Sequence, residues 1–63
     1  MISRWLVELA DRKLGRGALV YVVGGKWVAE RVSRADRTKI TGGTRDTLVW
    51  FLEQMPDVSA RAG

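Results

Sequence analysis

The side chains that most often serve enzymes as nucleophiles or proton carriers are missing from this sequence. Its 63 residues include no cysteine and no histidine, so neither a Ser-His-Asp nor a Cys-His arrangement can form. The carboxylate pairs Glu8/Asp11 and Asp36/Asp46 have the residue type for acid–base catalysis. Such pairs are more often solvated carboxylates on the protein surface than catalytic groups. We therefore expect no enzyme, no cofactor and no metal site, because carboxylates alone rarely hold zinc.

A glycine pair offers a second kind of chemistry. The segment Thr41-Gly42-Gly43-Thr44 lies between a predicted strand and a predicted helix, with Lys39 and Arg45 close by. A helix that begins after flexible glycines can present backbone N–H groups to a phosphate. The segment lacks the lysine and hydroxyl spacing of a P-loop. A glycine turn followed by a threonine cap is the simpler interpretation, and we favour it.

Basic side chains give the strongest indication of function. The net charge is +4, and residues 26–45 alone carry six basic and two acidic side chains. Such a concentration predicts contacts with nucleic-acid phosphates. The sequence lacks the aromatic ladder on which single-strand binders stack bases, so we expect a duplex, most simply DNA. The alternative is that these charges only keep a small protein in solution. The predicted nucleic-acid-binding residues are Lys26, Arg31, Arg34, Arg37, Lys39 and Arg45.

A tryptophan indicates a different kind of partner. Trp50 falls on the polar side of the predicted second helix, near Asp46 and Glu53, and Val49 is its neighbour. A large aromatic on a polar face is typical of a contact with another chain. Trp50 and Val49 are therefore the predicted protein interface, either for a homodimer or for docking on a larger protein. The other reading is that a loop or the C-terminal tail covers the ring.

The elements that position these residues begin with a helix and a hairpin. The spacing of apolar residues predicts a helix over 3–14, capped by Ser3 and stopped by Gly15, with Trp5 in its buried stripe. Residues 18–23 and 26–32 have strand composition and flank Gly24-Gly25, a two-residue turn. A two-residue turn would pair Val22 with Trp27 and Val20 with Ala29 on the face that looks like the core. The sequence alone leaves the register and the buried face of the sheet open.

A third strand and a second helix complete the pattern. Residues 38–41 read as a short strand, and Thr44 caps a helix whose predicted buried stripe is Leu48, Phe51, Leu52 and Met55. We predict an α+β fold in the order α-β-β-β-α. In this fold, two helices cover one face of a three-stranded antiparallel sheet. Residues 1–56 should form one small domain, and residues 57–63 a flexible C-terminal tail.

The length of the chain indicates how it is stabilised, and its apolar pattern indicates whether it enters a membrane. A domain of this size buries only about 60% of the surface of its unfolded chain, so self-association is an expected source of support. The longest apolar run, residues 18–23, is far shorter than the roughly 20 residues of a membrane helix. No signal peptide is evident, and we expect a cytoplasmic protein without membrane contact. Eight arginines against three lysines is typical of a GC-rich bacterial or phage genome.

Overall fold

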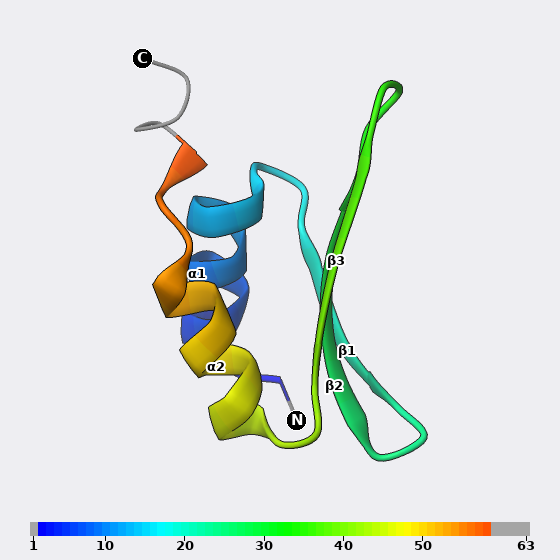
Figure 1. Cartoon of the computed structure of the whole chain (residues 1–63), viewed down its shortest axis with the longest axis vertical. Helices are drawn as coiled ribbons and strands as arrows, with labels where there is room; N and C mark the ends of the chain where they lie inside the picture. Colours follow the sequence, from blue (N-terminus) through cyan, green and yellow to red (C-terminus); the bar gives the residue numbers. More distant parts are fainter. Residues whose placement is uncertain (1, 59–63) are drawn as a thin grey trace.

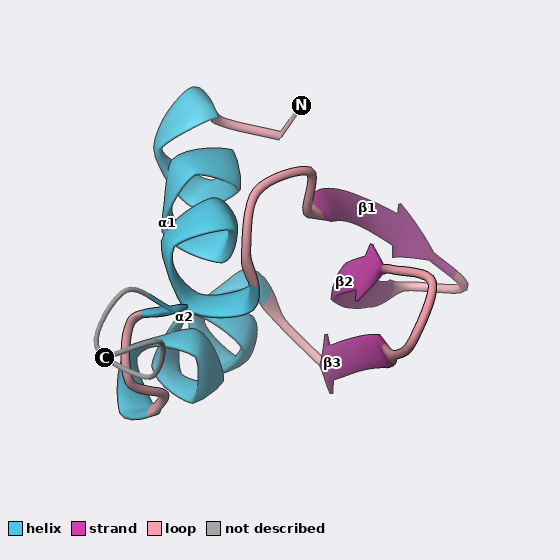
Figure 2. Ribbon diagram, turned by 90° about the horizontal axis from the view of Figure 1, so that it is seen from above, coloured by secondary structure: helices cyan, strands magenta, loops and turns pink. Residues whose placement is uncertain are grey.

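The structure, a computed structural model, describes residues 2–58 and confirms the predicted α+β fold. Two helices, α1 (Arg4–Leu14) and α2 (Arg45–Gln54), flank three strands, β1 (Leu19–Val23), β2 (Lys26–Val32) and β3 (Arg37–Gly42). The strands form an antiparallel sheet in the order β1-β2-β3. Figure 2 shows both helices on one face of this sheet. Helix α1 packs on β1 and β2, whereas α2 packs on β2 and β3. The opposite face, which faces right in Figure 1, has no second layer among the described residues.

Both helices begin and end where their capping residues lie. The N–H of Leu6 donates to Ser3 Oγ at the start of α1, and the N–H of Gly15 donates to the Asp11 carbonyl at its end. At the start of α2, the N–H of Thr47 donates to Thr44 Oγ1 at 3.2 Å. The predicted caps are therefore confirmed. Of the segment 41–44, Thr41 and Gly42 end β3, and Gly43 and the cap residue Thr44 connect that strand to α2.

The hairpin register follows from its two-residue turn. Gly24 and Gly25 both have positive φ, 57° and 76°, the conformation that a primed turn needs and that glycine adopts without strain. The turn aligns Val22 with Trp27 and Val20 with Ala29, as predicted. Because side chains alternate along a strand, these residues share the helix-covered face of the sheet.

The core lies between that face and the two helices. It joins buried residues of both helices to Ala18 and Ala29, with Leu6, Leu9, Ala10, Leu14, Leu48 and Leu52 as the helical contributors. Gly42 lets the second helix approach closely, since a Cβ there would lie 2.6 Å from the backbone nitrogen of Leu48. Close approach of α2 to β3 thus depends on the absence of a side chain at position 42.

Two aromatic residues depart from the predicted core. Trp5 is half exposed, and the guanidinium of Arg45 lies 5.5 Å from the centroid of its ring. Phe51 is 40% exposed. Helix α2 packs through Leu48 and Leu52, with Val49 and Met55 beside them. The buried side of the helix is therefore rotated towards Val49, and Phe51 falls outside it.

A buried lysine joins the end of the described chain to the first helix. Lys13 is 8% exposed, and its Nζ donates to the Met55 carbonyl at 2.8 Å. The same Nζ lies 2.8 Å from Asp57 Oδ1. This hydrogen bond from Lys13 holds the pKa of Asp57 below its usual range. We call this arrangement the Lys13 clasp. Of the tail predicted for 57–63, Asp57 is thus held on α1, and residues 59–63 lie outside the described part of the chain.

Candidate nucleic-acid interface

The second and third strands extend past the rest of the sheet as a two-stranded ribbon. Strand β1 begins at Leu19, opposite Glu30, so β2 beyond that point pairs only with β3. Figure 1 shows this hairpin rising past the end of α1 and the start of β1. We call residues 31–38 the β2–β3 ribbon. It is a narrow projection that carries three of the predicted basic residues, Arg31, Arg34 and Arg37.

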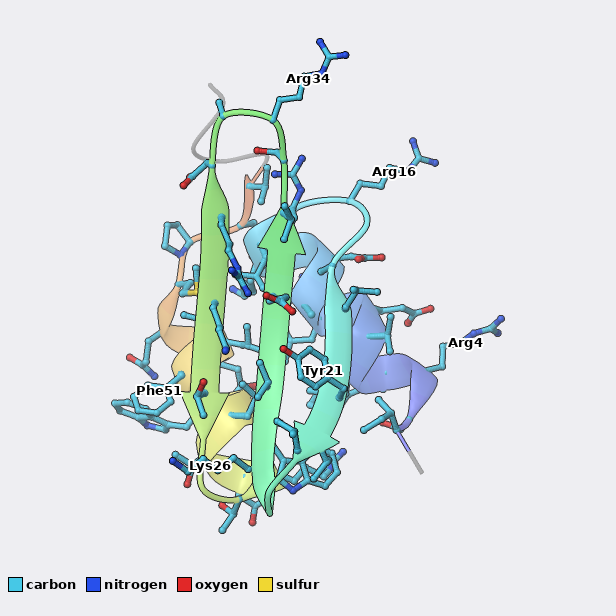
Figure 3. The ribbon with its side chains drawn as sticks, turned by 90° about the vertical axis from the view of Figure 1, so that its right-hand side faces the viewer. Arg4, Arg16, Tyr21, Lys26, Arg34 and Phe51 are labelled. Carbon is cyan, nitrogen blue, oxygen red and sulfur yellow. The ribbon has the colours of Figure 1, made fainter. Side chains whose placement is uncertain are left out.

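A compact turn forms the tip of the ribbon. The N–H of Ser33 donates to the carbonyl of Asp36 at 2.8 Å, and Ser33 Oγ donates to the same oxygen at 3.2 Å. The carboxylate of Asp36 accepts a hydrogen bond from the N–H of Arg37 at 2.7 Å. These bonds satisfy the turn internally and leave Arg34 exposed at the tip, where it points away from the molecule in Figure 3.

One ribbon arginine is held against the open face of the sheet. Arg37 Nε and Nη2 donate to Glu30 Oε2 at 3.3 and 3.2 Å. The other oxygen of Glu30 accepts a hydrogen bond from the Tyr21 hydroxyl at 2.8 Å. The Tyr21 hydrogen bond is the main reason that the pKa of Glu30 lies below its usual range. Burial opposes it, and the nearby charges of Arg37 and Lys39 lower the pKa further. Glu30 is therefore ionised at neutral pH, which fixes the orientation of Arg37.

A second ribbon arginine braces the loop between α1 and β1. Arg31 Nε donates to the Arg16 carbonyl at 3.1 Å. Its side chain also fills the space beside Gly15, where a Cβ would lie 2.7 Å from Arg31 Nε. This contact brings Arg16 to the ribbon end of the molecule, and Figure 3 shows Arg16 and Arg34 at that same end. Sequence reasoning missed Arg16. The available signal was its position between Gly15 and Gly17, a loop that follows a helix directly.

The predicted basic cluster is divided between the two ends of the sheet. Arg31, Arg34, Arg37 and Lys39 belong to the ribbon end. Lys26 follows the Gly24-Gly25 turn, at the end of the molecule opposite to Arg34 in Figure 3. Arg45 starts α2, close to the Trp27–Gly42 pair that lies near the same turn. With Arg16, the ribbon end holds five basic side chains against Glu30 and Asp36, an excess of three charges.

The exposed residues beside Trp50 differ from those of the predicted protein interface. Trp50 is 55% exposed, as expected, whereas Val49 is half-buried and packs against the core. Phe51 takes the place of Val49 beside Trp50, with ring centroids 5.3 Å apart in an edge-to-face arrangement. We call this pair the Trp50–Phe51 patch. Figure 3 shows Phe51 beside α2, far from the ribbon tip.

The described residues hold no enclosed site. Residues 2–58 form no pocket, and within that range no group of three or more potential metal-ligating side chains occurs. Neither α1 nor α2 has the length and apolar character needed to cross a membrane. The exposed ribbon and the exposed aromatic patch are therefore the features on which a functional proposal can rest.

No protein-family model, no curated protein and no solved structure matches this chain.

Proposed function

We propose that this protein binds duplex nucleic acid, with DNA as the expected partner, through the β2–β3 ribbon. The observation that carries the proposal is the projection of this two-stranded ribbon beyond β1, with Arg34 at its tip and Arg37 and Lys39 along β3. The major groove of B-form DNA is wide enough to admit a two-stranded ribbon. Basic side chains on the ribbon can then reach the phosphates on either side of the groove.

The exposure and hydrogen bonds of the basic side chains indicate which of them can contact phosphates and which support the fold. Arg34 and Lys39 are exposed, and among residues 2–58 neither makes a hydrogen bond or an ion pair. Arg34 at the ribbon tip and Lys39, which lies on β3 just outside the ribbon, are therefore well suited to phosphate contact. Arg37 is oriented by Glu30, and Arg31 supports the Arg16 loop. A non-enzymatic regulator that acts on DNA also agrees with the cytoplasmic location expected from the sequence.

A fluorescence-anisotropy titration with labelled duplex DNA tests the proposal at two salt concentrations, about 50 and 200 mM. We expect binding that weakens steeply with salt. Arg34→Ala combined with Lys39→Ala should remove two phosphate contacts and lower the salt slope by roughly 1.8, at about 0.9 per contact. A double-stranded RNA of the same sequence should bind more weakly, because its deep, narrow major groove does not admit the ribbon.

A matched control separates a site from general charge. Arg4→Ala combined with Lys26→Ala removes the same charge away from the ribbon, at positions marked in Figure 3. The control should keep the wild-type salt slope. Equal weakening in both double variants would show that only the total charge matters, and the absence of wild-type binding at low salt would reject the proposal.

A second candidate function rests on the Trp50–Phe51 patch. Two neighbouring aromatic rings, both substantially exposed, are typical of the centre of a protein–protein interface. We propose docking on a larger protein as the alternative role. A pull-down should then capture a protein, identified by mass spectrometry, that Trp50→Ala loses and Trp5→Ala keeps. Capture that does not differ between these two variants would count against the patch.

A further inference from the structure

The first strand forms an edge of the sheet whose own residues carry no charge or proline against further pairing. Strand β1 pairs with β2 on one side only. Residues 17–25 contain no charged residue and no proline, and Leu19, Val22 and Val23 are all exposed. Natural edge strands are usually protected by charges, proline, bulges or a covering element. The other edge strand, β3, carries Arg37 and Lys39 and so has the charges that β1 lacks.

The outer backbone groups of β1 belong to two valines. In an antiparallel pair, residues that exchange hydrogen bonds alternate with residues that do not. The two-residue turn makes Val23 and Lys26 an exchanging pair, so the N–H and C=O groups of Val20 and Val22 point away from β2. Ala18 agrees with this alternation, because its N–H points outward and donates to Asp11 Oδ1 at 3.1 Å. Asp11 thus closes the edge at Ala18 and leaves it open at Val20 and Val22.

We propose that β1 pairs antiparallel with β1 of a second copy of this chain, around a two-fold axis beside Tyr21. In this register, Val20 lies opposite Val22 of the second copy, and the two residues exchange both backbone hydrogen bonds. Leu19 lies opposite Val23 of the second copy on the open face. The interface is isologous, as two-fold symmetry requires, and it doubles the three-stranded sheet.

The side chains fit a second copy because every cross-strand pair is uncharged. Val20 and Val22 meet each other on the helix-covered face, and Leu19 and Val23 meet on the open face. The two Tyr21 rings become neighbours, and each hydroxyl is already held by its own Glu30 at 2.8 Å. Apolar and aromatic cross-strand pairs of this kind stabilise antiparallel sheets.

The distribution of charge also favours this edge. Each copy carries a net charge of +4, so the repulsion between two copies is smaller when they meet along an uncharged strand. The ribbon lies beyond the Leu19 end of β1. Antiparallel pairing places the Leu19 end of one copy beside the Val23 end of the other. The two basic ribbons therefore lie at opposite ends of the joined sheet, where their repulsion is weakest.

Sedimentation of the full chain from micromolar to millimolar concentration tests whether the dimer forms, and amide exchange tests where. We expect a concentration-dependent dimer in which the amide protons of Val20 and Val22 exchange slowly. On dilution to the monomer, these two amides should exchange quickly, whereas the amide of Tyr21, which faces β2, should change less. A monomer throughout this range would overturn the proposal. A dimer that leaves the Val20 and Val22 amides unprotected would overturn it as well.

Two lysine substitutions on the same sheet face provide a matched comparison. Val23 and Val32 are 59% and 66% exposed, both on the open face, but Val32 lies on the central strand. Val23→Lys places a charge opposite Leu19 of the second copy, twice per dimer. We expect it to raise the dimer dissociation constant about tenfold through these two cross-strand pairs. Val32→Lys adds the same charge and should leave the dimer nearly unchanged.

A proline variant tests the backbone contacts separately. Val22→Pro removes an N–H that points away from β2, so the hairpin can keep its own hydrogen bonds. It should abolish the dimer while the circular dichroism of the monomer is retained. A dimer that withstands both Val23→Lys and Val22→Pro, but is lost in Trp50→Ala, would place self-association on the Trp50–Phe51 patch and overturn the proposal.

Discussion

The two faces of the central strand bury their residues in different ways. On the helix-covered face, Ala29 is fully buried beneath α1 and α2. On the open face, Val28 is 2% exposed although no element covers it among the described residues. Its cross-strand neighbours are Tyr21 and Thr41. The side chain of Glu30, next along this face, is only 12% exposed. Side chains that lie along the sheet therefore shield the middle of the open face.

A sheet face without a second layer can therefore be partly ordered by polar contacts. The Tyr21–Glu30–Arg37 chain of hydrogen bonds holds an aromatic ring and a long side chain along the sheet. Such contacts between partly exposed groups are individually weak. The helix-covered face, in contrast, depends on close apolar packing, where small changes of volume are costly. Substitutions on the two faces should therefore differ in how much they lower the free energy of unfolding.

The largest effect should come from the helix-covered face. Leu48 is fully buried between α2 and the sheet. Leu48→Ala should lower the free energy of unfolding by about 2–5 kcal/mol, because it leaves a cavity that a small domain cannot easily refill. Chemical denaturation followed by circular dichroism measures the change. A loss of only about 0.5 kcal/mol, the usual range for exposed positions, would mean that this face is less tightly packed than the structure shows.

Close helix packing on the same face can be tested with two adjacent glycines. Gly42→Ala should cost about 1–3 kcal/mol, the usual range for overpacking, since the added Cβ would meet the Leu48 backbone at 2.6 Å. Gly43→Ala is the matched control, because a Cβ at Gly43 has no atom within 4 Å. Thermal unfolding of both variants measures the difference. Similar melting temperatures would contradict the close approach of α2 to β3.

An intermediate effect is expected at the shielded centre of the open face. Val28→Ala removes two buried methyl groups and should cost about 1.5 kcal/mol, at roughly 0.8 kcal/mol for each group. Val32→Ala, on the same face but exposed, should change stability by no more than about 0.5 kcal/mol. Denaturant titration of both variants gives the comparison. A cost at Val28 as large as that of Leu48→Ala would erase the distinction between the two faces.

The smallest effect concerns the ionisation of the open face. The Glu30 hydrogen bond raises the pKa of Tyr21, mainly by favouring the protonated hydroxyl. Glu30→Gln should move that pKa towards its ordinary value of about 10. The chain has a single tyrosine, so the absorbance of tyrosinate in an alkaline titration reports Tyr21 alone. An unchanged titration curve would show that Tyr21 does not contact Glu30 in solution.

The same pair has a predictable influence on stability across the pH range. The raised pKa of Tyr21 gives a contribution that is present below about pH 10 and is lost as the pH rises through the folded-state pKa. The lowered pKa of Glu30 gives a contribution that is present above about pH 4.3 and is lost as the pH falls through its folded-state pKa. Glu30→Gln should weaken both dependences, which melting temperatures at several pH values can show.

Local sequence signals were sufficient for the architecture. The Gly24-Gly25 turn determines which residues of β1 and β2 face each other, and the structure has the two pairs that such a turn predicts, Val22 with Trp27 and Val20 with Ala29. Ser3, Gly15 and Thr44 mark the helix ends through hydrogen bonds with their own neighbours. These features involve residues close together in the chain, so the sequence alone contains most of the information that specifies them.

Features that depend on how the elements meet were harder to predict. Helical periodicity placed Phe51 in the buried stripe, but the packing of α2 turns Val49 inward instead. The basic residues looked like one cluster, yet a strand advances about 3.3 Å per residue. Strand β2 therefore carries the chain from Lys26 at one end to the ribbon at the other. The shielding of Val28 also depends on neighbours from two other strands.

The Lys13 clasp has a consequence for how long the folded chain persists. Its hydrogen bond joins residues 42 positions apart, whereas the sheet is built from consecutive strands whose hairpins can form within microseconds. The clasp can close only after both helices have docked. Contacts that form after the folding transition state slow unfolding and leave the folding rate nearly unchanged. We therefore expect Lys13→Met to speed unfolding while leaving the folding rate nearly unchanged.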